Sequence, residues 1–178
     1  NTEIKVNKMS ILKKKESNLS LAFSPIKKYN QDFMFQKTTE IGIKNFFPIL
    51  CERSIVREIN IQRARKIVIE ASEQANRISV PEISKIQKLE NFLEKLSNDT
   101  SIIFCDINST SFDIDKNLSK VKPVCILIGP EGDFSETERR LILNHKKVLP
   151  VSLGQNILRS ETAAIVASTI ISFKFNLN

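Results

Sequence analysis

The sequence predicts an α/β fold in which helices cover both faces of a parallel sheet. Short apolar runs alternate with segments of helical periodicity, and this order builds parallel sheets through helical crossovers. The run from Val124 to Ile128 is apolar at every position, which is typical of a strand buried on both faces. Three of the four glycines fall in two loops that each follow a predicted strand and precede a predicted helix. Ligands of open α/β sheets bind at this carboxyl edge.

The predicted elements follow one another along the chain as strands and helices. Strands are expected at residues 19–23, 46–51, 101–106, 124–128 and 148–153. Helices are expected at about residues 31–41, 61–75 and 86–97, then after residue 135, and from residue 160 to about 173. Residues 107–122 are polar and are expected to form a loop.

Local signals mark several of these boundaries. Asn30 and Asn60 are expected to cap the first two helices. Gly42 follows the first helix at a position where the backbone often turns left-handed. Pro48 has no amide hydrogen, so its strand is expected to be an edge strand or an irregular one.

The composition fits one globular domain with a short arm. The 178 residues are 41% hydrophobic and 26% charged, and a chain of this length buries roughly two-thirds of its unfolded surface. The net charge of +7 suits a polyanionic partner such as nucleic acid. The first 16 residues hold five lysines and few large apolar residues, so residues 1–17 are expected to be a linker. The sequence begins with Asn1 rather than methionine, so an N-terminal portion is expected to be missing.

Cysteine and histidine usage argues against a metal site. Cys51, Cys105 and Cys125 are widely spaced and His145 is the single histidine, whereas structural zinc needs about four close ligands. Cys105 and Cys125 lie in apolar runs and are expected to be buried thiols, which suits the reducing cytoplasm. No apolar stretch approaches the ~20 residues of a membrane span, and no secretory signal is visible.

The two glycine loops form the candidate ligand site. They span residues 128–135 and 153–159. Ser135 and Glu138 fit the S-x-x-E pattern of a capping box, so a helix is expected directly after the first loop. Neither the G-x-G-x-x-G pattern of dinucleotide-binding folds nor the P-loop pattern occurs. Each loop alone also fits a tight turn with a helix cap, but two at neighbouring strand ends favour a ligand site.

Five ordered motifs resemble those of one family. Residues 127–132, L-I-G-P-E-G, are similar to I-G-P-E-G-G, and residues 153–163, L-G-Q-N-I-L-R-S-E-T-A, to L-G-x-x-I-L-R-x-E-T-A. Residues 36–42 resemble Q-K-A-T-E-L-G, residues 52–54 are E-R-S, and residues 73–82 resemble E-Q-x-x-R-x-x-V-P-E. These motifs, spread over roughly residues 19–173, resemble the RsmE family, the 16S ribosomal RNA uracil N3-methyltransferases of the SPOUT superfamily.

The resemblance implies a particular organisation. It implies a SPOUT methyltransferase domain at residues 18–178, with a C-terminal trefoil knot at about residues 100–175, an exception to the rule that chains do not knot. It also implies a homodimer whose two subunits complete the substrate site. Family members begin with a PUA-like β-barrel that helps bind RNA, so residues 1–17 would be a linker or a remnant of it. Asp133 stands where the family has a third glycine, and aspartate accepts a left-handed backbone better than most residues.

The resemblance also implies the cofactor and the reaction. The chain would use S-adenosylmethionine to methylate N3 of a uridine in the 16S rRNA of the small subunit, conventionally position 1498. It would work in the cytoplasm without a metal. The cofactor would lie bent in three loops, bounded by Asp106, Ile107, Leu127, Gly129, Glu131, Gly132, Leu153, Gly154, Ile157, Leu158 and Thr162. Core packing is the alternative role for the apolar residues, and helix capping for Thr162.

The chemistry needs positioning more than covalent help. The methyl group must be aligned with N3 while water is excluded, the uridine must be unpaired or flipped out, and the N3 proton must leave. Arg159 is the first candidate to bind phosphate or to polarise a uracil carbonyl. Arg53 and Arg77 are candidate RNA contacts. An interface ion pair is the alternative for Arg159, and a structural role for the other two.

Three other functions fit parts of the sequence. A hydrolase could bind phosphate at the helix after Gly132, although neither a P-loop nor a metal-ligand cluster supports it. A non-catalytic RNA-binding module would show steeply salt-dependent binding and no cofactor. A SPOUT methyltransferase with another RNA target would share every motif above.

Overall fold

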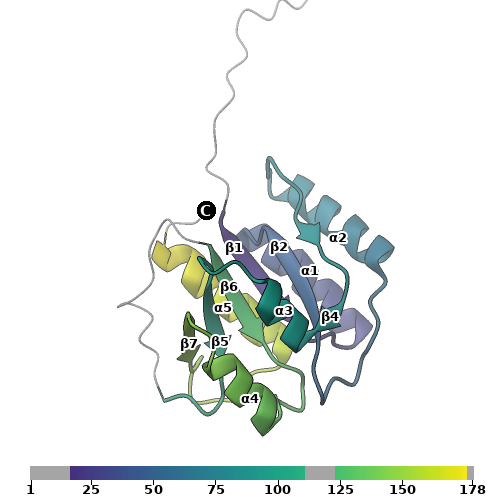
Figure 1. Ribbon diagram of the computed structural model, residues 1–178. Helices are drawn as coiled ribbons and strands as arrows, with labels where there is room; N and C mark the ends of the chain where they lie inside the picture. The colour runs from purple at the N-terminus through teal and green to yellow at the C-terminus, as the bar shows by residue number, and fades with distance from the viewer. Residues whose placement is uncertain (1–16, 111–122, 176–178) are drawn as a thin grey trace, which may run out of the picture.

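The computed structural model describes residues 17–110 and 123–175, and the predicted α/β fold is confirmed in them (Figure 1). The strands are β1 (Leu19–Phe23), β2 (Asn45–Leu50), β3 (Glu82–Ile83), β4 (Gln87–Lys88), β5 (Ser101–Cys105), β6 (Val124–Ile128) and β7 (Val148–Val151). The helices are α1 (Lys28–Ile41), α2 (Ile61–Gln74), α3 (Leu89–Lys95), α4 (Glu136–Leu143) and α5 (Ser160–Phe175). The sheet order is β3-β2-β1-β6-β5-β7, with β4 also paired to β2, and these pairings are parallel.

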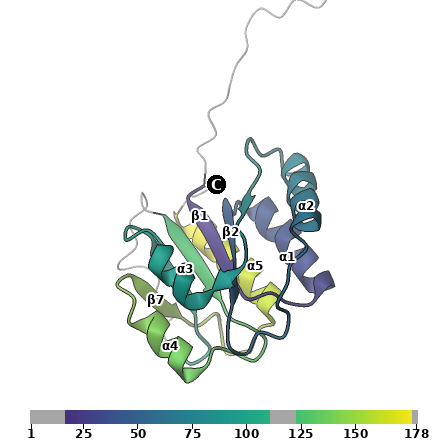
Figure 2. The same ribbon diagram turned by 45° about the vertical axis from the view of Figure 1, so that its right-hand side comes forward.

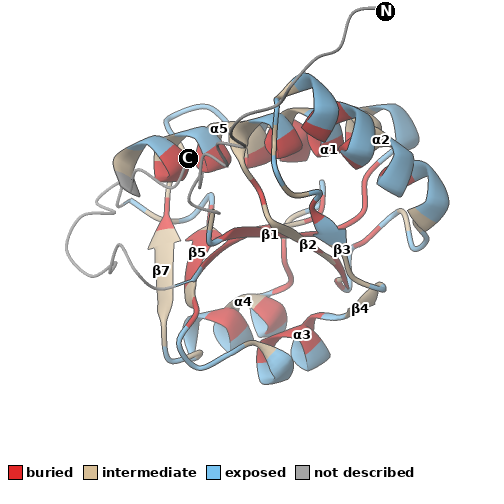
Figure 3. Ribbon diagram, turned by 90° about the horizontal axis from the view of Figure 1, so that it is seen from above, coloured by how far each residue is buried: buried red, intermediate tan, exposed pale blue. Residues whose placement is uncertain are grey.

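The sheet is the middle of three layers. Figure 3 shows α1, α2 and α5 on one face and α3 and α4 on the other. Strand residues alternate between the two cores: Leu21 and Ile126 pack on the side of α1 and α5, whereas Ala22 and Leu127 pack on the side of α3 and α4. Both faces of the central strands are therefore buried, as the uninterrupted apolar run of β6 predicts.

The start of α1 differs from the prediction. Its N-cap is Lys27, without a side-chain cap hydrogen bond, so the expected cap at Asn30 is wrong. The chain is turned into α1 by Gln31, whose Oε1 accepts a hydrogen bond from the Ile26 backbone N–H at 3.3 Å. At the other end Gly42 has the expected positive φ, 121°. Asn60 caps α2 as predicted, because its side chain accepts from the Arg63 backbone N–H at 2.9 Å.

Pro48 lies in a strand with neighbours on both sides, so the expectation of an edge strand is wrong and that of an irregular one is confirmed. On one side β2 pairs continuously with β1. On the other, β3 pairs with Asn45 and Phe46, and β4 with Ile49 and Leu50, leaving a break between them. A residue without an N–H costs least where the ladder is interrupted. Pairing of β4 also shortens the helix expected at 86–97 to Leu89–Lys95.

Some expectations fall wholly or partly outside the described residues. These are the arm at 1–16, residues 111–122 of the expected loop, and the end of the chain at 176–178. The knot expected at about 100–175 includes residues 111–122, so it stays a prediction.

Figure 2 shows α5 crossing behind the sheet beside α1. Within the described ranges, no helix combines the length and apolar character needed to cross a membrane.

Candidate active site

Three loops at the carboxyl ends of β5, β6 and β7 surround a cleft of about 480 Å³. The lining residues are Lys27, Asn30, Cys105, Ile107, Ile128, Gly129, Pro130, Glu131, Asp133, Ile157, Leu158, Arg159, Ser160 and Ala163. A smaller pocket of about 90 Å³ adjoins it between the loops after β5 and β7. Ile107, Ile157 and Leu158 belong to both cavities. The parallel sheet thus places both glycine loops and a third loop around one hollow.

The structure brings most of the implied cofactor contacts to these two cavities. Those that line one or both are Asp106, Ile107, Gly129, Glu131, Leu153, Gly154, Ile157 and Leu158. Three do not line either cavity. Leu127 is fully buried in the core on the side of α3 and α4, Gly132 faces Arg53, and Thr162 is exposed on the first turn of α5.

Of the two glycines in the first loop, Gly129 is the one whose surroundings leave no space for a side chain. A Cβ at Gly129 would lie 2.6 Å from Phe134 Cε2, whereas a Cβ at Gly132 would meet nothing closer than Arg53 Cβ at 3.5 Å. Asp133 has φ of 60°, and its Oδ1 accepts a hydrogen bond from the Phe134 backbone N–H at 2.8 Å. This local hydrogen bond is the kind that lets aspartate occupy the left-handed region. Asp133 therefore turns the loop where the family has glycine.

A buried carboxylate joins this loop to the E-R-S segment after β2. Glu138 Oε1 accepts from the Glu52 backbone N–H at 2.7 Å, and its Oε2 accepts from the Ser135 backbone N–H at 2.9 Å. Ser135 Oγ accepts from the Glu138 backbone N–H at 3.3 Å, so the predicted capping box is confirmed. Arg53 Nη1 donates to the Gly132 carbonyl at 3.1 Å. Residues 52–54 thus brace the first glycine loop.

The loop after β5 is anchored by Asp106, whose side chain is 1% exposed. Its Oδ2 accepts from Arg139 Nη2 at 2.8 Å and Nε at 3.1 Å, and its Oδ1 accepts from the Asn108 backbone N–H at 3.0 Å. These hydrogen bonds with Asp106 raise the pKa of the Arg139 guanidinium. By contrast, the loops after β6 and β7 are joined to each other, because Ser160 Oγ donates to the Gly129 carbonyl at 3.2 Å. The side chain of Asp106 is therefore held by Arg139 of α4 and by the Asn108 backbone, and the residue also lines the smaller pocket.

Two cations and two carboxylates line the cleft. Arg159 is exposed, and its carbonyl accepts from the Ala163 backbone N–H at 2.8 Å, so it stands at the start of α5. Lys27 stands at the N-cap of α1, and the carboxylates belong to Glu131 and Asp133. The cleft therefore offers both positive and negative side chains to a bound polar molecule.

The sequence reasoning missed Lys27 and Asn30, which lie far from the glycine motifs in the chain. They reach the cleft because β1 pairs with β6, which sets the end of β1 beside the first glycine loop. No sequence signal marked Lys27, because the helix was expected to begin at Asn30 and the N-cap position of Lys27 is visible only in the structure.

The structure does not bring Arg77 to the cleft. Its Nη1 donates to the Thr39 carbonyl at 2.6 Å and to the Ile43 carbonyl at 2.8 Å, closing the C-terminal end of α1. The cleft lies at the opposite end of this 14-residue helix, about 20 Å away at 1.5 Å per residue. Arg53 also lines neither cavity, but it contacts the first loop directly.

The cysteines are free thiols. Burial raises the pKa of Cys51, Cys105 and Cys125 to about 12, so each is protonated at neutral pH and none is a ready nucleophile. Cys125 is buried as predicted, whereas Cys105 is half-buried and lines the cleft. Among the described residues, no group of three or more His, Cys, Asp or Glu side chains is placed to hold a metal ion.

Comparisons with known proteins agree on one family. The RNA methyltransferase domain family matches residues 13–172. Ribosomal RNA small subunit methyltransferase E of Rickettsia conorii is 34% identical over 156 residues, which are 85% of this chain and 63% of the relative. The Buchnera aphidicola (subsp. Schizaphis graminum) protein of the same name is 33% identical over 93% of this chain and 71% of its own length. This chain therefore spans less than two thirds of the Rickettsia relative.

A solved structure gives the same answer for the fold. Ribosomal RNA small subunit methyltransferase E from Neisseria gonorrhoeae, bound to S-adenosyl methionine, superposes with a TM-score of 0.84 at 29% identity. The match covers 92% of this chain and 70% of the other. The predicted SPOUT methyltransferase fold class is confirmed by this similarity.

Proposed function

The chain belongs to the ribosomal RNA small subunit methyltransferase E family, and from this membership we propose that it transfers a methyl group from S-adenosylmethionine to ribosomal RNA. The observation that carries the proposal is the three-loop cleft at the carboxyl edge of the sheet, which is lined in large part by residues of the motifs at 127–132 and 153–163. A family member of the same fold is bound to S-adenosyl methionine.

The residues of the two cavities fit this cofactor. Apolar Ile107, Ile157 and Leu158 would pack against the adenine, while loop backbone groups would bind its polar edge. The carboxylates of Glu131 and Asp133 complement a cationic sulfonium and amino group. When bound, the cofactor supplies an activated methyl group, so the protein has only to orient the acceptor and exclude water.

For the acceptor we propose N3 of a uridine in 16S rRNA. This atom lies in the base-pairing edge, so the base must be unpaired or flipped into the cleft. Arg159 and Lys27 would polarise its carbonyl oxygens, which favours loss of the N3 proton. Glu131 and Asp133 line the same cleft and are the candidates to receive that proton or to pass it to water.

The assembly proposed here is a homodimer that acts on the small ribosomal subunit in the cytoplasm. Two exposed apolar side chains support the homodimer. Ile107 and Ile157, which line the site, are 56% and 83% exposed, and a second subunit would cover them. Free, buried cysteines are compatible with a reducing compartment.

The test is a methyl-transfer assay on small ribosomal subunits that lack the modification. Nucleosides from the digested RNA would be separated and identified by mass spectrometry. We expect N3-methyluridine to accumulate with time and protein concentration. A methylated nucleoside of another kind would reassign the target, and cofactor binding with no transfer to any RNA would contradict the enzymatic function.

A further inference from the structure

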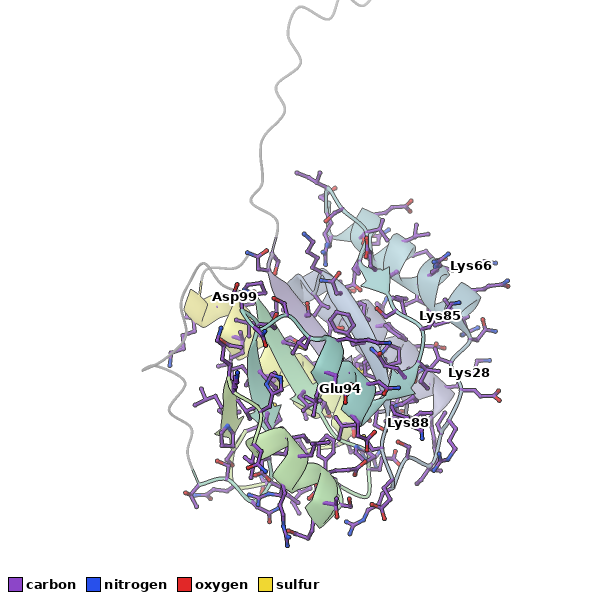
Figure 4. The ribbon with its side chains drawn as sticks, viewed as in Figure 1. Lys28, Lys66, Lys85, Lys88, Glu94 and Asp99 are labelled. Carbon is purple, nitrogen blue, oxygen red and sulfur yellow. The ribbon has the colours of Figure 1, made fainter. Side chains whose placement is uncertain are left out.

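A basic flank leads away from the cleft. It is formed by residues 26–29, 55–66 and 84–88, which carry eight basic residues and one acidic residue, Glu58. In Figure 4 the labelled Lys28, Lys66, Lys85 and Lys88 lie along one side of the molecule, whereas Glu94 and Asp99 lie away from it. None of the five family motifs includes these four lysines.

The flank adjoins the cleft at one point and comes near the first glycine loop at another. Lys28 directly follows Lys27, which lines the cleft. Lys88 pairs with Leu50 at the carboxyl end of β2, and the next segment of that chain holds Arg53, which contacts the first glycine loop. Because all these strands are parallel, this end of β2 belongs to the edge of the sheet that carries the cleft.

The charges of the flank are largely uncompensated. All four lysines are exposed, and within the described residues none of them forms an ion pair. Among the other basic residues of the flank, Arg63 pairs with Asp32 at 2.7 Å. Elsewhere in the described residues, Arg139 pairs with Asp106 at 2.8 Å and Lys147 with Asp99 at 3.4 Å. Unpaired like charges repel one another, so such a surface favours a bound polyanion.

We propose that this flank, Lys28, Lys66, Lys85 and Lys88, binds phosphates of the RNA strand that leads the target nucleotide into the cleft. The proposal rests on the proposed function and names the part of its substrate that the flank would hold. Lysines bind phosphate as point charges without reading sequence, so the flank would contribute affinity and orientation while the cleft selects the base.

The test compares two triple variants of the full chain. One variant carries Lys66→Gln, Lys85→Gln and Lys88→Gln on the flank. The matched control carries Lys95→Gln on α3, Arg140→Gln on α4 and Lys146→Gln after α4, with the same loss of charge. Lys28 is left in place because it adjoins Lys27. RNA affinity is measured by filter binding over a range of salt concentrations, and cofactor affinity and methyl transfer are measured in parallel.

We expect the flank variant to bind RNA about tenfold or more weakly at low salt. The slope of log affinity against log salt should fall by about 0.7 per lost single-strand contact. Its KM for RNA should rise with little change in kcat or in cofactor affinity, and the control should change RNA affinity much less. Equal losses in both variants, or an unchanged salt slope, would overturn the proposal. Loss of cofactor binding in the unmodified chain would instead count against the proposed function.

Discussion

Gly129 has no room for a side chain, because a Cβ there would lie 2.6 Å from the Phe134 ring. We expect Gly129→Ala to push the ring from its contact with Phe104, to lower the free energy of unfolding by about 1–3 kcal/mol through overpacking, and to weaken cofactor binding. Gly132→Ala is the control, and should stay within about 0.5 kcal/mol. Denaturant unfolding checks both variants. Equal effects would show that the two glycines serve the same turn.

Arg159 is the predicted site residue with the clearest position in the cleft. Loss of a charge-assisted hydrogen bond costs about 1.5–3 kcal/mol, so Arg159→Ala should lower kcat/KM for RNA by about 10- to 150-fold. Cofactor affinity should change little, since the proposed cofactor contacts are apolar side chains, loop backbone groups and the carboxylates of Glu131 and Asp133 rather than Arg159. Steady-state kinetics beside cofactor titration separates the two effects. An unchanged kcat/KM would move Arg159 to the interface role.

Single-residue roles were the part of the site least visible in the sequence. The motifs placed Gly129, Ile157, Leu158 and Arg159 correctly at one cavity, because they lie in the two loops themselves. The motifs did not distinguish a residue whose side chain lines the cleft from one that only supports a cleft loop by a hydrogen bond. Arg53 donates to the Gly132 carbonyl from the turn after β2, and this contact depends on packing that no local spacing encodes.

At the scale of elements, Glu138 couples α4 to the loop after β2. A glutamine keeps one acceptor oxygen but sets an NH₂ group against the second backbone N–H, so Glu138→Gln should cost about 1–3 kcal/mol of stability. It should also weaken cofactor binding, because the first glycine loop would lose its brace. Ser135→Ala removes only the cap and should cost about 1 kcal/mol. Thermal unfolding with and without cofactor measures both, and a smaller loss in Glu138→Gln than in Ser135→Ala would contradict this role.

Long elements were predictable and short ones were not. The burial of β6 and the cap of α2 followed from an unbroken apolar run and from one asparagine. The two-residue strands β3 and β4 are too short to show a hydrophobic periodicity. They are defined by their backbone pairing with β2. The start of α1 was misplaced for a similar reason, since Gln31 turns the chain through a contact with the Ile26 backbone.

For the whole molecule, the three thiols, of which Cys51 and Cys125 are buried and Cys105 is half-buried, give a stability that depends on pH. Their pKa rises from 9.0 to about 12 in the fold, so the folded state favours the protonated form. This contribution is complete below about pH 9 and is lost as the pH rises toward 12. Cys125→Ala should therefore show a shallower decline of unfolding free energy across that range than the unmodified chain. If the unfolding free energies of the variant and the unmodified chain declined with the same slope, a contribution of the Cys125 thiol would be contradicted.

Isothermal titration of the purified chain with S-adenosylmethionine, with Arg159→Ala beside it, tests whether the three-loop cleft binds the cofactor. We expect saturable binding near one cofactor per chain, retained in the variant because Arg159 is assigned to RNA. A folded chain that takes up no cofactor would contradict the claim that the three-loop cleft is a methyltransferase active site, and a non-catalytic RNA-binding module would then be the better description.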